Sequence, residues 1–303
     1  MRASLATAKD LERLKAPVFE VKYDGFRALA ALSGQRLELW TRNRLDLAGR
    51  FPELARALLK VEAPEAVLDG EIVALDGRQV SRFELLFEPR APRRYVAFDL
   101  LWLDGQDLRG RPLDERRGLL EALVERAGPL LLLAERLVAD TPREALRRAR
   151  ARGVEGVVAK ERAGRYRAGS SHDWRKVKLT ATQELAIVGY TPMSTGEQAV
   201  GALLLAVRSG SSFEYAGKVG TGFSDEQRRT LREALDEDLS GAAPPARAPR
   251  ERGPKWVRPR YVAQVRFAEW TRDGRLRHPV FLGLRPDRTP ADCVRELPEP
   301  GAR

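Results

Sequence analysis

Three charged residues alternate with apolar ones in a short segment near the start of the chain. The run FEVKYDGFRAL (19–29) places Glu20, Lys22 and Asp24 at every second position. Successive side chains of a β-strand point to opposite faces, so these three charges would share one face. A lysine amine can act as a nucleophile where its surroundings favour the neutral form. A solvated edge strand would show the same alternation, so this segment alone leaves both interpretations open.

Lysine is rare in this chain, which makes its positions informative. The sequence contains nine lysines and 45 arginines, so arginine supplies most of the positive charge. Chemistry that needs a titratable amine cannot use arginine, because the guanidinium pKa is too high. Four of the nine lysines fall in short strand-like runs, and we treat these four as candidates for such chemistry: Lys22, Lys160, Lys176 and Lys178.

The amino-acid composition limits the number of domains and the kind of partner that we expect. At 303 residues, with 43% hydrophobic and 32% charged residues, the chain can form one large domain or two ordinary ones, each with its own core. The net charge of +11 suggests a polyanionic partner, nucleic acid above all. An arginine-rich composition can also give a basic protein without that function.

Several kinds of site are disfavoured by what the sequence lacks. The single Cys293 excludes an intrachain disulfide framework and a cysteine-cluster zinc site. His172 and His278 are the only histidines, which argues against a histidine-rich metal site and a Ser-His-Asp triad. No apolar run approaches membrane-spanning length, and the first residues lack the apolar core of a signal peptide. We therefore expect a cytoplasmic protein.

Strand-like and helix-like segments alternate along the first two-thirds of the chain. Helices are predicted at 51–60, 114–127 and 142–152, the last opening with a Thr141–Glu144 capping box and Pro142 at its first position. The predicted strands are 19–24, 28–32, 36–41, 66–75, 94–103, 153–160 and 173–179.

After about residue 182 the chain becomes mostly strands, at 184–191, 201–207, 213–220 and 261–271. One helix follows Ser224, where Ser224 and Gln227 form a second capping box. Short strands with one interposed helix fit a small barrel of the OB type. The proline- and arginine-rich stretch 240–256 should be a mobile loop. We thus predict an α+β domain over 1–182 followed by an all-β OB-fold domain over 183–303.

Six motifs then occur in the order known from one family. The run EVKYDGFR reads K-x-D-G-x-R, the signature of covalent nucleotidyltransferases, and the chain resembles an ATP-dependent DNA ligase, most of all the ligase module of bacterial end-joining ligases. The closing run 265–287 also matches that family. The other motifs are TRNRLDL (41–47), LDGEIVAL (68–75), YVAFDLLWLDG (95–105), EGVVAK (155–160) and WRKVK (174–178).

The resemblance implies a fold, cofactors and partners. It implies an α+β nucleotidyltransferase domain and an OB-fold barrel, with ATP as the nucleotide and Mg²⁺, or Mn²⁺, as the metal. It implies a monomer that acts on nicked or broken duplex DNA near the nucleoid, in company with DNA end-joining proteins. An RNA ligase or capping guanylyltransferase and a catalytically silent DNA-end-binding module are the alternatives. Nick versus double-strand-break preference stays open.

The resemblance also assigns the site residues. Lys22 would attack the α-phosphorus of ATP, while Asp24 and Gly25 shape the turn that presents it, for which a simple hairpin turn is the alternative. Glu20 would accept from the adenine amino group, and Phe98 would stack on the purine, although alone it would more simply be core. The remaining assignments are Arg27 and Arg42 to the nucleotide, Glu71 to ribose and metal, and Glu155 to metal.

Two lysine positions follow from strand geometry. Lys176 and Lys178 lie two apart and would share a face with Trp174, and their repulsion is relieved if the triphosphate lies between them. A solvated face is the alternative. Lys160 is an odd number of positions from Glu155, so on a straight strand the two would diverge, and its role stays open.

The end of the chain carries the last assignments. By resemblance, Arg285 and Asp287 would orient pyrophosphate in a closed form, reached by rotation of the OB domain about residues 179–184. The alternative is that both hold the carboxy-terminal strand in place. Two departures from the family pattern put details in doubt: Ser170 stands where an arginine is expected, and Arg288 replaces the usual lysine.

Overall fold

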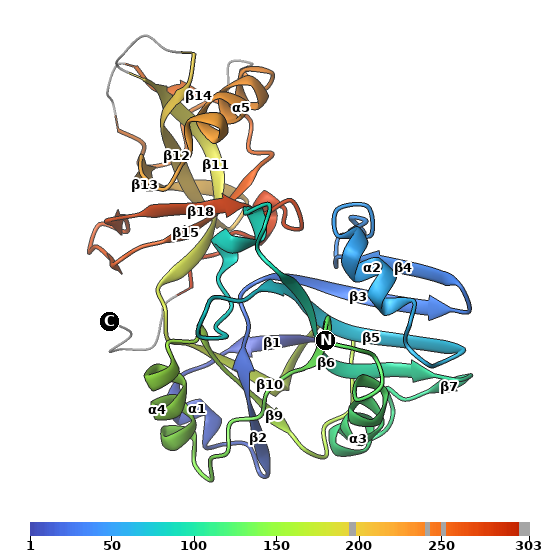
Figure 1. The fold of residues 1–303 in the computed structure, drawn as a ribbon. Helices are drawn as coiled ribbons and strands as arrows, with labels where there is room; N and C mark the ends of the chain where they lie inside the picture. The colour runs from blue at the N-terminus through green and yellow to red at the C-terminus, as the bar shows by residue number, and fades with distance from the viewer. Residues whose placement is uncertain (194–197, 240–242, 250–252, 297–303) are drawn as a thin grey trace. The chain divides into compact units, whose positions relative to one another are not determined.

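The chain divides between Thr180 and Ala181 into two compact units, called unit 1 and unit 2 below (Figure 1). The computed structural model describes residues 1–193, 198–239, 243–249 and 253–296. The predicted boundary at 182/183 lies two residues further along the chain. The α+β domain followed by an OB-fold domain is the predicted fold class, and the arrangement of strands described below confirms it.

The first sheet of unit 1 has four strands in the order β1-β10-β9-β2. Its members are β1 (Arg2–Leu5), β2 (Pro17–Lys22), β9 (Gly156–Glu161) and β10 (Ser170–Lys178). One face packs an apolar cluster against helices α1 (Ala8–Leu11) and α4 (Pro142–Arg152). That cluster includes Phe19, Val21, Val157, Ala159 and Val177. The other face is therefore the one that the charged residues of β2 occupy.

The second sheet of unit 1 has the order β4-β3-β5-β6-β7, with β8 paired in parallel to β6. Figure 1 shows these strands side by side in a layer separate from β1, β2, β9 and β10. Helix α3 packs on β6 and β8, and the remaining helical segments are α2 and the short helix η1. The bounds are β3 (Phe26–Ser33), β4 (Arg36–Trp40), β5 (Glu65–Ala74), β6 (Arg93–Leu103), β7 (Gln106–Asp107), β8 (Leu131–Leu133), α2 (Pro52–Leu58), α3 (Leu113–Val124) and η1 (Phe83–Phe87).

The Asp24–Gly25 link carries the chain from the first sheet to the second. Strand β2 pairs with β9, whereas β3 pairs with β4 and β5, so the hairpin-turn interpretation of this pair is wrong. A Cβ on Gly25 would lie 2.1 Å from the carbonyl oxygen of Ile72. Glycine is needed here because the backbone passes so close to β5. The Asp24 N–H donates to the Ser81 hydroxyl (2.9 Å), which fixes the link.

The helix ends agree with the predicted caps at one site and differ at another. Ser224 and Gln227 form both hydrogen bonds of a capping box at the start of α5 (Asp225–Asp236). At α4 the Thr141 side chain accepts from the Glu144 N–H, but the Glu144 carboxylate accepts from the Asp140 N–H and pairs with Arg148. The predicted box is therefore only half formed, because Glu144 reaches past the cap.

Unit 2 is built on a sheet in the order β13-β12-β11-β15-β18, with β14 paired to β11. The Phe281 N–H on β18 donates to the Thr221 carbonyl just after β13 (3.0 Å), so the two ends of this order meet and close the barrel. Inside it lies an apolar core into which α5 inserts Leu231 and Leu235. The strands are β11 (Thr182–Pro192), β12 (Val200–Ser209), β13 (Ser212–Val219), β14 (Lys255–Trp256), β15 (Val262–Arg266) and β18 (Val280–Leu284).

Two predictions for unit 2 need correction. The predicted strand 261–271 divides into β15 and β16 (Glu269–Trp270), because β16 leaves the barrel to pair with β17 (Leu276–Arg277). The predicted mobile loop 240–256 lies partly outside the described residues, and its described parts are attached: Ala246 exchanges backbone hydrogen bonds with β13, and β14 pairs with β11. No helix among the described residues is long and apolar enough to span a membrane.

Candidate active site

The register of the first sheet gathers the charged residues of three strands on one face. Directly opposite residues share a face: Lys22 lies opposite Gly156, which lies opposite Lys178. By the same rule Lys160 lies opposite Trp174. The face opposite the apolar cluster therefore carries Glu20, Lys22, Lys160, Trp174, Lys176 and Lys178.

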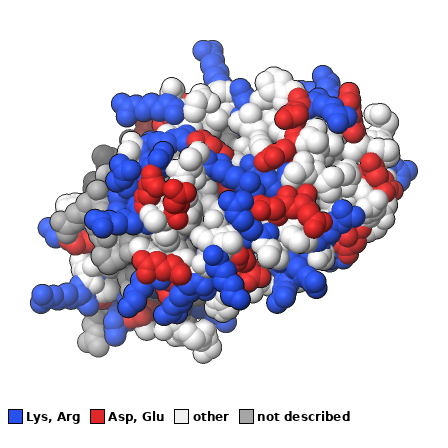
Figure 2. All heavy atoms as spheres, turned by 90° about the horizontal axis from the view of Figure 1, so that it is seen from below, with Lys and Arg blue, Asp and Glu red and all other residues white. Residues whose placement is uncertain are grey.

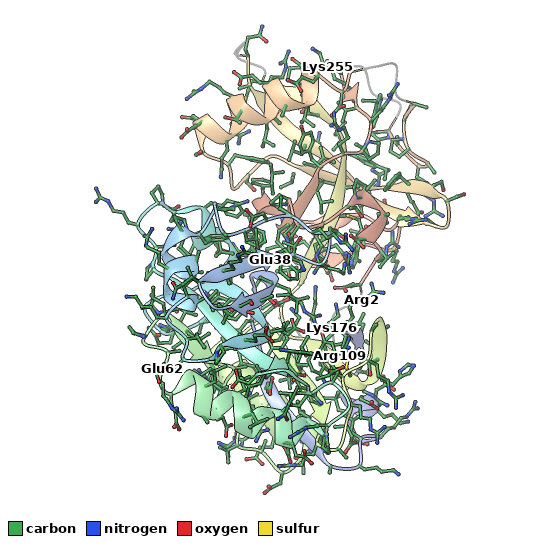
Figure 3. All side chains as sticks on the ribbon, turned by 90° about the vertical axis from the view of Figure 1, so that its right-hand side faces the viewer. Arg2, Glu38, Glu62, Arg109, Lys176 and Lys255 are labelled. Atoms are coloured by element: carbon green, nitrogen blue, oxygen red, sulfur yellow. The ribbon has the colours of Figure 1, made fainter. Side chains whose placement is uncertain are left out.

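This charged face is covered rather than solvated. Glu20 is 2% exposed, Lys160 1% and Lys178 5%, and the Lys22 side chain is 17% exposed. The solvated-edge interpretation of residues 19–24 is therefore wrong, although β2 does end the strand order of its sheet. Burying a charge is costly unless partners or a ligand compensate it, so this face needs such partners. Figure 3 shows Lys176 in the middle of unit 1, whereas Glu62 lies at its outer margin.

Glu155 is the partner of Lys22. The Lys22 Nζ donates to Glu155 Oε2, and Lys178 Nζ lies 3.9 Å from the other carboxylate oxygen. Glu155 precedes the first residue of β9, so the strict alternation that predicted divergence from Lys160 does not apply, and that expectation is wrong. Gly156 allows the approach, because a Cβ there would lie 2.1 Å from the Val177 carbonyl oxygen. Two lysines thus converge on one carboxylate.

Glu20 is held by two cations. Its Oε2 lies 2.6 Å from Lys160 Nζ, and its Oε1 accepts from Arg117 (3.1 Å). Arg117 belongs to α3 and was not predicted as a site residue. The missed signal is its position, since it shares the buried side of the helix with Leu113, Leu120 and Leu123. An arginine at an apolar-stripe position must find a buried acceptor.

The second sheet contributes Arg27 and the unpredicted Asp69. Arg27 binds the fully buried Asp69 through two hydrogen bonds (2.9 and 2.5 Å). The Tyr166 hydroxyl donates to the same carboxylate (2.7 Å), and burial, with Asp69 adding to it, raises the pKa of Tyr166. Arg27 also lies opposite Glu71 in the sheet. The predicted nucleotide contact of Arg27 stays a prediction, and Asp69 fixes the direction of its guanidinium.

Phe98 lies where the two sheets meet. The register of β5 and β6 shifts between Asp69 and Gly70, so Phe98 occupies a β-bulge that turns its side chain. Its ring packs edge-on against Trp174 with centroids 5.9 Å apart, and the Arg27 guanidinium lies 5.4 Å from its centroid. Lys160 Nζ donates to its carbonyl (3.1 Å). The ring is half-buried, so it is not simply core, and its stacking on a purine stays a prediction.

A buried ion pair begins at the residue that follows Phe98. Asp99 and Arg116 form two hydrogen bonds of 2.7 Å, and both side chains are fully buried. Burial raises the pKa of Asp99, although Arg116 opposes that rise. Arg116 also donates to the carbonyls of Arg111 and Gly164, which ties the segment before β10 to α3. No local pattern in the sequence predicts this pair.

The predicted metal ligands lie on different sheets. Glu71 is on β5, and Glu155 precedes β9. The described residues include no cluster of three or more His, Cys, Asp or Glu side chains suited to a metal. Mg²⁺ requires fewer protein ligands, since one or two carboxylates with phosphate oxygens and water complete its coordination. Carboxylates such as those of Glu71 and Glu155 are ligands of the kind that Mg²⁺ accepts, and their role as metal ligands stays a prediction.

The remaining predicted residues lie on other segments of the chain. Arg42 is exposed in the loop after β4, and Ser170 is exposed at the start of β10, opposite Arg2. In unit 2, Arg285 and Asp287 are each 4% exposed and joined by two hydrogen bonds (2.8 and 2.7 Å). Their contact with pyrophosphate stays a prediction.

The surface charge is mixed where it can be seen from below. Figure 2 shows Lys and Arg interspersed with Asp and Glu on that face, with no continuous field of one sign. Ion pairs near the surface, such as Arg148–Glu144 and Arg162–Asp114, also place opposite charges next to one another. Such pairs contribute little to stability, typically about 0–1 kcal/mol. The face in Figure 2 therefore does not have the charge pattern of a nucleic-acid track.

Comparisons with known proteins give one consistent result. Residues 1–178 match the family profile "ATP dependent DNA ligase domain", and residues 196–288 match "ATP dependent DNA ligase C terminal region". The chain is 38% identical over 291 residues to the multifunctional non-homologous end joining protein LigD of Pseudomonas aeruginosa. The matched region covers 92% of this chain and 35% of that protein. The chain is 36% identical over 302 residues to LigD of Mycolicibacterium smegmatis, covering 96% of this chain and 39% of that protein.

A solved structure, a mycobacterial DNA ligase D complexed with ATP and MES, is similar over 97% of both chains, with a TM-score of 0.70 and 35% identity. The ligase domain of Mycobacterium tuberculosis LigD gives the same identity with a TM-score of 0.52. This chain spans 35% to 39% of the two LigD relatives described above.

Proposed function

Because this chain belongs to the ATP-dependent DNA ligase family, we propose that it seals breaks in duplex DNA through a lysyl-AMP intermediate on Lys22. The observation that carries this proposal is the position of Lys22 on the covered face of the first sheet. Its amine is paired with Glu155, beside a second lysine, Lys178. The face brings together a nucleophile and several lysines, which is what attack on a triphosphate requires.

In the first step the Lys22 Nζ attacks the α-phosphorus of ATP. A nitrogen–phosphorus bond forms, the bond to the bridging oxygen breaks, and pyrophosphate leaves with the electron pair. The amine must lose its proton, and Glu155 Oε2, which already accepts from Nζ, is placed to take it. Lys176 and Lys178 lie on the same face and would stabilise negative charge that develops on the phosphates.

Base recognition falls to the other end of that face. Glu20 offers carboxylate oxygens to the adenine amino group, and Phe98 offers its half-buried ring to the purine. The fixed guanidinium of Arg27 is available to ribose or phosphate oxygens. Mg²⁺ held by Glu71 or Glu155 and the phosphates would neutralise charge on the triphosphate. The following steps transfer AMP to a DNA 5′-phosphate and join it to the adjacent 3′-hydroxyl.

A role in end joining is a more specific proposal than membership of the ligase family. Relatives named for non-homologous end joining support a role in joining DNA ends, together with other end-joining proteins. Nicked or broken duplex DNA is the substrate that this role requires. The surplus of basic residues over the whole chain, which gives a net charge of +11, supports binding to such a polyanion.

Mass spectrometry of the purified protein, with and without ATP and Mg²⁺, tests the proposal. We expect a single AMP adduct that maps to Lys22, and sealing of a nicked duplex by the loaded protein. An adduct on another lysine would overturn the assignment of Lys22. Absence of any adduct, in a protein that still binds nicked DNA, would favour a silent end-binding module.

A further inference from the structure

The carboxylate of Glu20 receives a hydrogen bond from a helix that carries none of the family motifs quoted above. Arg117 extends from α3, and its NH1 donates to Glu20 Oε1 at 3.1 Å. The two side chains are 3% and 2% exposed, so water contributes little at this contact. Lys160, which belongs to the first sheet, contacts the other carboxylate oxygen of Glu20. Glu20 is therefore fixed from two directions, by its own sheet and by α3.

Arg117 is itself anchored at three points. Its NH2 donates to the carbonyl of Ala134 (2.5 Å), and its Nε donates to Glu121 (3.0 Å), one turn further along α3. The guanidinium is planar, so two anchored nitrogens determine the direction of the third. The segment after Ala134 runs beside β2, where the Val21 N–H donates to the Glu135 carbonyl (3.0 Å). Arg117 thus ties α3 to the strand that carries Glu20 and Lys22.

An acceptor fixed in this way can discriminate between purines. Each carboxylate oxygen has two lone pairs, so one bond from Lys160 and one from Arg117 leave each oxygen able to accept from a further donor. The adenine amino group supplies a donor at the position where guanine presents a carbonyl oxygen. Opposite a fixed carboxylate, that oxygen finds no donor, and a buried polar group without a partner is costly. A carboxylate that could rotate would discriminate less well.

We propose that Arg117 is a positioning residue for base selection: it fixes the Glu20 carboxylate so that the site accepts adenine and rejects guanine. This inference rests on the proposed function, because it concerns the same nucleotide site. Arg117 touches no reacting atom, and its effect is exerted through Glu20.

The test compares Arg117→Gln and Arg117→Lys with the unchanged protein, using full-length chain throughout. Initial rates of AMP- and GMP-adduct formation are measured over a range of ATP and of GTP concentrations. The matched control is Arg126→Gln, an exposed arginine just beyond the end of α3. Thermal unfolding of each variant is measured alongside.

In Arg117→Gln we expect KM for ATP to rise and the ATP-to-GTP ratio of kcat/KM to fall roughly tenfold or more, since a fixed acceptor is lost. Arg117→Lys should recover part of that ratio, and Arg126→Gln should leave it unchanged. A lowered melting temperature with an unchanged ratio would overturn the inference, because loss of fold affects both nucleotides equally. If the unchanged protein forms no adduct with ATP, the proposed function itself fails. An adduct in that protein, with an unchanged ratio in Arg117→Gln, defeats the inference alone.

Discussion

Each unit contains a largely buried network of charges, and the contacts within the two networks differ in geometry. In unit 1, Lys22 and Lys178 converge on Glu155 at one end of the first sheet. In unit 2, Arg285 binds Asp287 through two hydrogen bonds and also contacts Glu184, which Arg288 approaches to 3.6 Å. In the first network each lysine approaches the carboxylate singly, and in the second Arg285 holds Asp287 through two parallel hydrogen bonds.

This difference in geometry separates groups that can turn to a ligand from groups that are held in place. A lysine ammonium is a point charge with rotatable donors, so Lys22 and Lys178 can turn from Glu155 towards a triphosphate. The Arg285 guanidinium is planar and also donates to the Gln264 side chain (3.2 Å), so it is held at several points. The geometry of unit 2 therefore supports a structural role for Arg285 and Asp287, whereas the family resemblance predicts a pyrophosphate contact. The predictions below separate these roles.

The largest effect is expected at the nucleophile. Lys22→Ala removes the amine, and Lys22→Arg replaces it with a guanidinium that stays charged at neutral pH. We expect both to reduce self-adenylylation by about 10⁴-fold or more, to the background rate. Incubation with radiolabelled ATP and detection of labelled protein provides the measurement. An adduct that persisted in either variant would place the nucleophile elsewhere.

The next effect tests the Glu155 network of unit 1. Glu155→Gln keeps the size of the side chain but removes its charge and its capacity to take a proton from Lys22. We expect self-adenylylation to fall roughly 10²- to 10⁴-fold, the usual contribution of a positioned base. Single-turnover rates at saturating ATP check this. A loss of less than about threefold would show that Glu155 only neutralises Lys22 in the resting protein.

Arg285→Ala tests the Arg285 network of unit 2. Removing Arg285 leaves the buried Asp287 and the half-buried Glu184 beside fewer cations, and breaking a buried pair typically costs about 3–5 kcal/mol of unfolding free energy. We expect a lower melting temperature and parallel losses in self-adenylylation and in sealing of a pre-adenylylated nick. Asp287→Ala should behave likewise.

The opposite result for Arg285 would restore the contact with pyrophosphate. Selective loss of self-adenylylation, with pre-adenylylated sealing and melting temperature preserved, is the pattern that such a contact produces. It would also require Arg285 to exchange its carboxylates for phosphate, as in the predicted closed form with a rotated OB domain.

The smallest effect concerns surface charge away from both networks. Each phosphate contact on duplex DNA contributes about −0.9 to the slope of log affinity against log salt. Replacing Arg247, Arg250 and Arg252 by Ala should make that slope shallower and leave self-adenylylation intact; the last two residues lie outside the described ones. Nick binding measured from low to moderate salt checks this, and a salt-insensitive affinity would refute an electrostatic mode of binding.

The sequence by itself determined the parts of this protein that depend on local pattern. Alternation fixed the charged face of β2, and spacing put Lys176 and Lys178 on one face with Trp174. Capping at Ser224 and the change from mixed elements to strands gave α5 and the fold class. The order and identity of the six motifs indicated the family, because motif residues at fixed spacing can be recognised without knowledge of their contacts.

Tertiary structure alone decided which charges meet. Asp69, Arg117 and Tyr166 lie far along the chain from Arg27 and Glu20, the residues that they hold, and no local pattern connects them. Glu155 reaches Lys22 because it stands just outside β9, where the alternation that predicts strand faces no longer applies. Gly25 is required by the nearby carbonyl of Ile72 on another strand and not by a turn. Burial brings charges together through space. The order of residues along the chain does not give the distance between segments that are far apart in the sequence.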